Sequence, residues 1–212
     1  MISLKEIITD LNSFKKTYLI DFEIDTINIS FDKRYKLEKL KKLGKWHKIK
    51  KENEVYPKIE KRLTKKEITS AFLLEDYSIY YINLSDYPQY RKAELVIFGL
   101  FQYHKSAPPN NLVEQLCKIT KNITSLDICY DFPQKPNIDK LKEYYKVTQY
   151  QDTYYINNTN HPMIKKICIY DKKKKNNLDF EVYRLEATII IPDTKYLDLP
   201  LYEVNDILKL VR

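Results

Sequence analysis

The sequence predicts a single α+β domain over residues 1–212, with a largely antiparallel central sheet and helices packed on one face. Three observations predict this class. Several short segments alternate apolar and polar residues, as half-buried strands do. A few amphipathic segments have helical spacing, and the order along the chain is strands, helix, strand, helix, strands. Hydrophobic residues make up 43% of the 212 residues, enough to bury a core without disulfides.

The first half of the chain contains a helix, a strand and a hairpin. Weak helical periodicity predicts a helix over 4–16, and clean alternation predicts a strand over 22–31. Residues 32–66 are dense in lysine and predict a basic, partly helical insertion. Residues 77–84 and 93–98 are typical of two paired strands.

The second half begins after Pro108 and Pro109 with an amphipathic helix from Asn110. Asn137 is expected to cap the next helix, and Pro133 and Pro192 each end a strand. The expected elements are a helix from 110, a strand over 124–132, a helix over 137–147, strands over 153–156, 167–170 and 180–191, and a helix over 204–211.

The composition favours a polyanionic partner. The net charge is +8 and the isoelectric point is near 9.1, which favours nucleic acid before a membrane. No signal peptide or membrane-spanning run is predicted, so a cytoplasmic location is expected. The two glycines cannot form a phosphate-binding loop or a dinucleotide fingerprint, so any ATP-driven strand separation would come from a partner.

The three cysteines, Cys117, Cys129 and Cys168, form no C-x-x-C pair. Neither a zinc ribbon nor a disulfide framework is therefore supported. Their apolar neighbours indicate small packing residues in a reducing compartment.

Polar residues that could carry chemistry recur at alternate positions of three predicted strands. Residues of equal parity share a strand face, because successive side chains point to opposite sides. Charged groups in a buried face are costly, so this face is expected on the exposed side of the sheet. The three sets are Asp127, Cys129 and Asp131; Cys168, Tyr170 and Lys172; and Val182, Arg184, Glu186 and Thr188.

These groups suit a metal-assisted attack of a tyrosine hydroxyl on a DNA phosphate. Asp127, Asp131 and Glu186 offer hard oxygen ligands for Mg²⁺ or Mn²⁺. A phenol is a poor nucleophile at neutral pH, and Lys172 together with the metal is expected to favour the Tyr170 phenolate. The product would be a 5′-phosphotyrosyl DNA, whose ester keeps the energy needed for rejoining.

The motifs resemble those of the Rep_trans family, the replication initiation factors of rolling-circle plasmids and some phages, related to the HUH nucleases. The match falls in the family's order over most of the chain. Ser125 stands where the family has an arginine. The matching segments are Ile24-Asp25-Thr26-Ile27, Ser125-Leu126-Asp127-Ile128-Cys129-Tyr130-Asp131, Thr153-Tyr154-Tyr155-Ile156, Ile167-Cys168-Ile169-Tyr170-Asp171-Lys172 and Tyr183-Arg184-Leu185-Glu186.

The resemblance implies that Tyr170 nicks single-stranded or cruciform origin DNA. It implies Asp127 and Glu186 as metal carboxylates, with Asp25 and Asp131 as further candidates. Lys172 and Arg184 complete the expected catalytic set. A host helicase and a second copy of the chain are further expected partners. Origin recognition is expected from the basic segment 32–66.

Other interpretations stay open. A relaxase for mobilisation would use the same chemistry, and a non-catalytic DNA-binding regulator could share the fold. An RNA-binding protein would explain the charge and the tyrosines. Asp127 and Asp131 could be salt-bridge partners, and Arg184 with Glu186 could be an ordinary cross-strand pair.

Three further segments have both a structural and a functional interpretation. Residues 172–175 form either a solvated turn or a phosphate-tracking cluster. Trp46 and His47 are expected to be a local packing anchor rather than a site. The tyrosines near the hairpin either pack in the core or stack bases, with basic neighbours in Arg91 and Lys92; they are Tyr77, Tyr80, Tyr81, Tyr87 and Tyr90.

Overall fold

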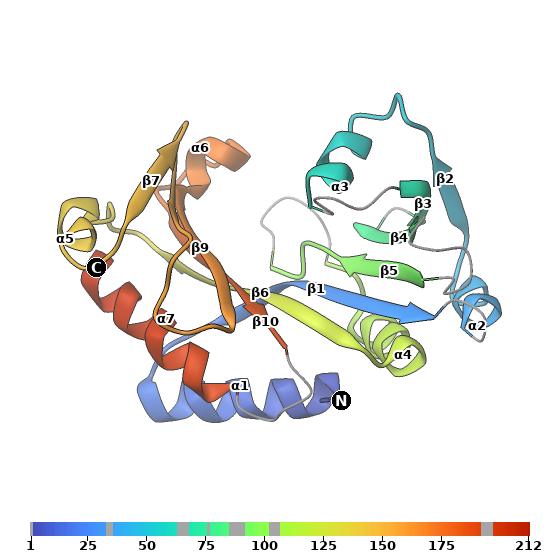
Figure 1. The fold of residues 1–212 in the computed structure, drawn as a ribbon, viewed down its shortest axis with the longest axis horizontal. Coiled ribbons are helices and arrows are strands. Elements are labelled where there is room, and N and C mark those ends of the chain that lie inside the picture. The colour runs from blue at the N-terminus through green and yellow to red at the C-terminus, as the bar shows by residue number, and fades with distance from the viewer. Residues whose placement is uncertain are drawn as a thin grey trace. The chain divides into compact units, whose positions relative to one another are not determined.

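The computed structural model describes residues 2–32, 36–62, 68–75, 77–84, 92–101, 107–191 and 197–212. The chain divides into two compact units, and the neighbouring strands within each unit pair in antiparallel fashion. Unit 1 is essentially Thr26–Thr124, and unit 2 combines Leu4–Asp25 with Ser125–Arg212. The predicted α+β class with a largely antiparallel sheet is confirmed (Figure 1). Within the described ranges, no helix is long and apolar enough to cross a membrane.

Unit 1 has strands in the order β2-β3-β4-β5-β1. The predicted hairpin is confirmed as β4 paired with β5. The basic segment contributes two short helices and an edge strand, β2, which the sequence pattern did not predict and which pairs with β3. The elements are β1 (Glu23–Asp32), α2 (Leu37–Lys41), β2 (Trp46–Ile49), α3 (Tyr56–Arg62), β3 (Ile68–Leu74), β4 (Ile79–Leu84), β5 (Lys92–Ile97) and α4 (Asn110–Thr120).

The two faces of the unit 1 sheet differ. On one face, residues of even parity on β4 and β5 pack with α3 into an apolar cluster that includes Tyr80, Ile82 and Val96. On the other face Phe72 and Tyr81 are opposite each other on β3 and β4, and Phe31 packs against Tyr81. An aromatic cluster therefore lies on the face opposite α3.

Unit 2 has strands in the order β6-β10-β9-β8-β7. Asn137 caps α5 as predicted, since its side chain accepts a hydrogen bond from the Lys140 amide at 3.1 Å. That helix is shorter than predicted, and Val147 instead begins β7. The elements are α1 (Leu4–Tyr18), β6 (Ile123–Phe132), α5 (Ile138–Lys142), β7 (Val147–Tyr150), β8 (Thr153–Ile156), β9 (Ile164–Asp171), α6 (Lys172–Asn176), β10 (Tyr183–Ile190) and α7 (Asp198–Val211).

Helices α1 and α7 cover the apolar face of the unit 2 sheet (Figure 1). On β10 this face presents Leu185, Ala187 and Ile189, all fully buried. Helix α7 contacts both β10 and α1. The apolar residues of α1 recur every three or four positions, which places them on one side of the helix. The alternate residues of the same strands therefore form the opposite face, which carries the candidate site.

Candidate functional site

The strand register in unit 2 brings the predicted polar residues onto one face. Strand β10 lies between β6 and β9 and pairs with both in antiparallel fashion. The residue parity predicted from the sequence is thereby confirmed. From β6 through β10 to β9, the aligned residues are Asp131–Arg184–Tyr170, Cys129–Glu186–Cys168 and Asp127–Thr188–Lys166.

Arg184 lies at the centre of this face and binds two carboxylates. Its Nε and Nη2 donate to the two oxygens of Asp131 at 2.6 and 2.7 Å. Its Nη1 donates to Asp25 Oδ1 at 3.1 Å. Burial acts to lower the pKa of Arg184, but the hydrogen bonds to Asp131 and nearby charges raise it overall. The guanidinium thus stays charged and fixes both carboxylates.

The prediction that this face is exposed is wrong. Arg184 is 0% exposed, Asp127 is 3% exposed and Tyr170 is 5% exposed. Lys172 and Asp25 are also buried. The charges can be buried because they pair with one another, which offsets part of the cost of removing them from water. A parity pattern identifies the residues that share a face but gives no information on what covers it.

The Tyr170 hydroxyl donates a hydrogen bond to Glu186 Oε2 at 3.1 Å. Burial raises the pKa of Tyr170 well above its ordinary value, and the Glu186 charge raises it further. The shift is opposite to the one predicted from Lys172. Lys175, which was not among the predicted site residues, places its Nζ 3.8 Å from the Tyr170 ring centroid. Tyr170 is thus held as a neutral phenol beside a carboxylate that can accept its proton.

Lys172 begins helix α6 and is 2% exposed. Burial lowers its pKa, the charge of Arg184 lowers it further, and the charges of Asp25 and Asp131 oppose both effects. The lysine-rich segment is a single capped helical turn, because the Asp171 carboxylate accepts from the Lys174 amide at 2.9 Å. Lys172 therefore belongs to the charge network around Arg184.

The acidic residues suit a divalent cation that keeps water or phosphate oxygens among its ligands. Asp25 and Asp131 lie near the cations Arg184 and Lys172, while Lys166 and Lys175 add positive charge near Cys168. Burial raises the pKa of Asp25, and the charge of Glu186 raises it further. A cation beside Asp25 and Glu186 would relieve that repulsion.

The number of available carboxylates limits what such a site could be. Among the residues that the structure describes, no three His, Cys, Asp or Glu side chains converge as a complete ligand set. Mg²⁺ commonly binds through one or two carboxylates plus water and phosphate oxygens. Asp131 is held by Arg184, and Asp127 accepts a hydrogen bond from Thr188 at 2.7 Å. Asp25 accepts from Arg184 and Glu186 accepts from Tyr170, and these two carboxylates are the pair whose mutual repulsion such a cation would relieve.

A cavity of about 600 Å³ lies within unit 2 at the ends of β9 and β10. Its lining includes Tyr170 and residues of the loop before α5 and of α6. Lys173 pairs with Glu181 at 2.5 Å, and Lys174 lies 3.8 Å from Asp152. Aromatic, basic and acidic side chains thus surround the space next to the candidate nucleophile, and the acids of the lining are Asp152, Asp171 and Glu181. The tyrosines and lysines of the lining are Tyr154, Tyr170, Tyr183, Lys135, Lys173 and Lys174.

Sequence reasoning missed two contacts of this site. The Tyr170–Glu186 hydrogen bond is diagonal, because Glu186 is directly opposite Cys168 rather than Tyr170. Long side chains at diagonal positions on antiparallel strands can reach each other. Knowledge of the register between β9 and β10 would therefore have predicted the Tyr170–Glu186 contact. The approach of Lys175 to the ring depends on the helical turn of α6, which composition alone does not give.

The other predicted groups lie elsewhere. Tyr155 on β8 is aligned with Cys168 on β9, and Tyr154 lines the same cavity as Tyr170. Tyr87, Tyr90 and Arg91 of the predicted stacking set lie outside the described residues.

No protein-family model matches the chain, and no curated protein matches it.

Proposed function

We propose that the chain nicks and rejoins single-stranded or cruciform DNA at an origin of rolling-circle replication, through a covalent bond to Tyr170. The observation that carries the proposal is the hydrogen bond from the Tyr170 hydroxyl to Glu186 at 3.1 Å, beside a cavity whose lining includes tyrosines, lysines and acidic residues. A nucleophile within hydrogen-bonding reach of a base is the arrangement that covalent catalysis requires.

In the proposed step, Tyr170 Oη attacks the phosphorus of a phosphodiester. The Oη–P bond forms, the P–O3′ bond breaks, and the phenolic proton passes to Glu186 Oε2. The leaving 3′-oxygen takes a proton from water. The product is a 5′-phosphotyrosyl ester, and reversal of the step rejoins the strand.

The remaining residues have supporting roles. Arg184 fixes Asp131 and Asp25 in place, and Lys172 balances their charge. Mg²⁺ or Mn²⁺ held by Glu186 and Asp25 would polarise the phosphate and stabilise the charge that develops on it. The tyrosines of the cavity offer stacking surfaces for unpaired bases. A host helicase would supply strand separation.

A denaturing gel tests this proposal. The protein is incubated with hairpin-bearing single-stranded oligonucleotides and Mn²⁺ or Mg²⁺, and a slower protein–DNA band is sought. Tyr170→Phe should abolish the band. Tyr183→Phe, which alters another tyrosine of the same cavity, should retain it. A band that survives in Tyr170→Phe would contradict the assignment of the nucleophile.

A relaxase that starts mobilisation would carry out the same step, and the choice of origin DNA in the assay separates a relaxase from a replication initiator.

A non-catalytic DNA-binding regulator is the second candidate. The 5% exposure of Tyr170 favours it, because a phosphate has little access to that hydroxyl. This candidate predicts DNA binding without a covalent band, and equal binding by wild type and Tyr170→Phe.

A further inference from the structure

Unit 1 contains a second cavity, of about 430 Å³, between α2 and the sheet. Its walls are largely apolar and aromatic. Helix α2 supplies Leu37 and Leu40, while strands β2, β3 and β4 supply Trp46, Phe72 and Tyr81. The volume is within the range of pockets that bind small ligands. The proposed nicking reaction does not use this cavity.

The aromatic wall is fixed in position. Trp46 Nε1 donates to the Leu40 carbonyl at 3.0 Å, which ties the indole to α2. The Trp46 and Tyr81 rings make an edge contact with centroids 6.1 Å apart, and the Phe72 and Tyr81 centroids are 5.9 Å apart. These contacts leave the rings preorganised for a flat ligand. Trp46, predicted to be a local packing anchor, is also part of a cavity wall.

A polar group completes the lining. Asn83 Oδ1 accepts from the Tyr81 hydroxyl at 2.6 Å, and Asn83 Nδ2 donates to Ser70 Oγ at 2.7 Å. The amide is thereby oriented within a cavity whose lining also includes Lys41. An oriented amide beside aromatic rings can recognise the edge of a base while the rings contact its face.

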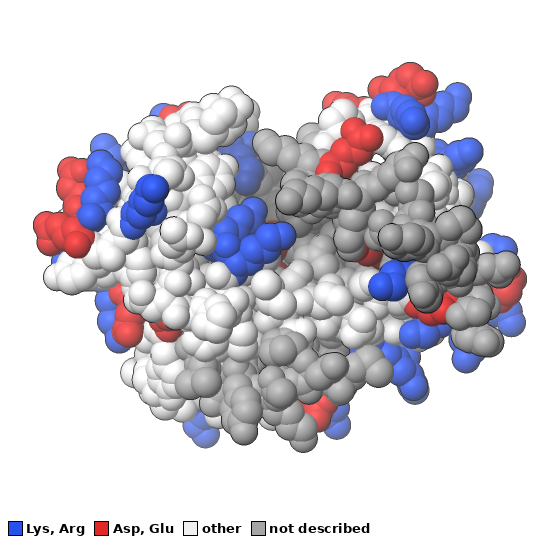
Figure 2. All heavy atoms as spheres, viewed as in Figure 1, with Lys and Arg blue, Asp and Glu red and all other residues white. Residues whose placement is uncertain are grey.

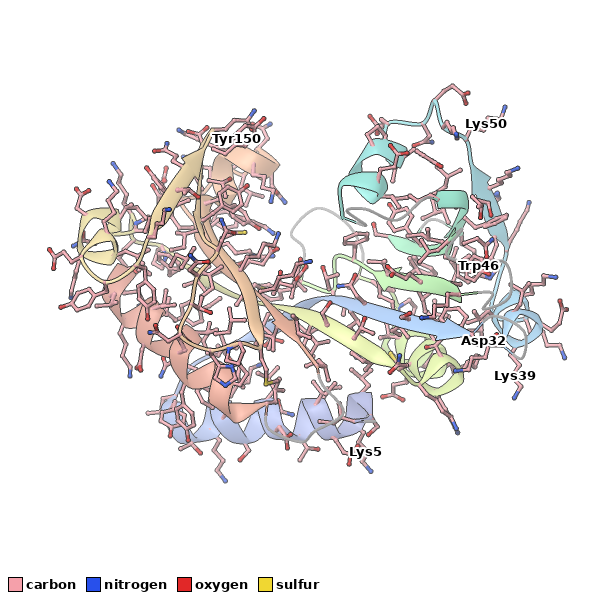
Figure 3. All side chains as sticks on the ribbon, viewed as in Figure 1. Lys5, Asp32, Lys39, Trp46, Lys50 and Tyr150 are labelled. Atoms are coloured by element: carbon pink, nitrogen blue, oxygen red, sulfur yellow. The ribbon has the colours of Figure 1, made fainter. Side chains whose placement is uncertain are left out.

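The surroundings of the cavity are strongly basic. The segment from Lys36 to Lys51 contains eight lysines and a single acidic residue, Glu38, in a chain whose net charge is +8. Lys39, Lys42 and Lys45 are exposed. Figure 2 shows basic side chains along the side of unit 1 that carries α2 and β2. Figure 3 labels Lys39, Trp46 and Lys50 along that same side.

We infer that this cavity binds an unpaired base of single-stranded DNA, whose phosphates lie on the lysines of the Lys36–Lys51 segment. Aromatic walls alone would suit many apolar ligands, but the concentrated positive charge selects one with a polyanionic backbone. The choice of DNA rests on the proposed function. Binding itself requires neither Tyr170 nor a metal.

Trp46 provides a direct readout, because it is the only tryptophan in the chain. Its fluorescence is titrated with a short oligothymidylate, in Tyr170→Phe protein with EDTA, so that no cleavage can occur. We expect saturable quenching. An abasic oligonucleotide of equal length and charge should bind more weakly and quench little. Equal quenching by both oligonucleotides would overturn the inference, because it would show that phosphates alone are bound.

Two matched pairs of variants locate the binding. Phe72→Leu removes part of the cavity wall, and Phe98→Leu makes the same change in the apolar cluster on the opposite face. Stacking on an aromatic side chain predicts that Phe72→Leu weakens oligothymidylate binding about 5-fold or more. Phe98→Leu should leave it unchanged in folded protein. Equal binding by the two variants would overturn the inference.

The second pair tests the lysines. The triple variant Lys39→Gln, Lys42→Gln and Lys45→Gln should lower the slope of log K against log salt by about 2. Lys5→Gln, Lys16→Gln and Lys209→Gln, on α1 and α7, make the same charge change in unit 2 and should leave the slope unaltered. A covalent band without Trp46 quenching would retain the proposed nicking function and remove this inference. Trp46 quenching without a covalent band would retain this inference and contradict the proposed nicking function.

Discussion

The guanidinium of Arg184 makes two hydrogen bonds, at 2.6 and 2.7 Å, to the carboxylate of Asp131, directly opposite it on the neighbouring strand. The Arg184 side chain is fully buried and that of Asp131 is 9% exposed. This buried bidentate pair stabilises the packing of β6 against β10 and holds the charged residues near Tyr170 in position. Removal of Asp131 takes away two of the hydrogen bonds that compensate the buried guanidinium.

Asp131→Asn should therefore destabilise the protein strongly. An amide cannot replace the charged bidentate contact with Arg184, and breaking a buried pair typically costs about 3–5 kcal/mol. Urea unfolding measures the loss. Asp139→Asn, which alters an exposed pair with Lys142, serves as the control and should change stability little. A loss at Asp131 no larger than in the control would show that the pair contributes little.

Asp25→Asn should behave differently from Asp131→Asn. Burial and the charge of Glu186 raise the pKa of Asp25, so the folded state binds its proton more tightly than the unfolded state does. The carboxyl then contributes stability below its unfolded pKa of about 3.9, and that contribution is lost as pH rises through the folded pKa. At neutral pH in EDTA, Asp25→Asn should be at least as stable as wild type. Its advantage should shrink as the solution is acidified, which thermal melts in both conditions would detect. A variant much less stable than wild type at neutral pH would contradict this assignment.

A divalent cation should stabilise the folded protein through Glu186. A ligand that binds only the folded state at 100 times its Kd adds about 2.7 kcal/mol of stability. Mn²⁺ should raise the melting temperature of wild type, and binding should diminish the sharp electron paramagnetic resonance signal of the free ion. Glu186→Gln should remove both effects, whereas the exposed Glu143→Gln should retain them. Identical Mn²⁺ binding in Glu186→Gln and wild type would place the ion elsewhere.

The three cysteines should be unreactive in the folded protein. All are buried, and burial raises the pKa of Cys117 to about 12 and that of Cys168 to about 11. Burial also raises the pKa of Cys129 well above its ordinary value. Since the thiolate is the reactive form, a thiol reagent at mildly alkaline pH should label none of them quickly. Addition of urea should release three reactive thiols, and rapid labelling without urea would contradict the described packing.

Residue alternation predicted part of the site, because it shows which side chains of a strand lie on the same face. Alternation assigned Asp127, Asp131, Arg184 and Glu186 to one face of the sheet, because strand periodicity is a local property. The Tyr170–Glu186 contact depends on register between two strands, and the bond from Arg184 to Asp25 joins residues 159 positions apart. Neither can be read from local spacing.

Three strands, β2, β3 and β7, were not predicted, and the two that lie at the ends of the strand order have equally physical reasons. Strand β7 is mostly exposed at the edge of its sheet, so its sequence lacks the apolar alternation that indicates a strand. Strand β2 lies at the edge of the unit 1 sheet and is surrounded by lysines, whose density suggested a solvated insertion instead. In each case the strand forms because it pairs with its neighbour, and not because its residues have a high intrinsic preference for strand structure.

Mass spectrometry of the protein–DNA adduct tests the central claim most directly. Trypsin releases residues 167–172 as a peptide whose single tyrosine is Tyr170, and it releases Tyr150, Tyr154 and Tyr155 together in residues 147–165. After incubation with hairpin DNA and Mn²⁺, followed by nuclease digestion, a nucleotide should be linked through phosphate to the 167–172 peptide. A nucleotide on the 147–165 peptide, with the 167–172 peptide unmodified, would contradict the assignment of Tyr170 as the nucleophile.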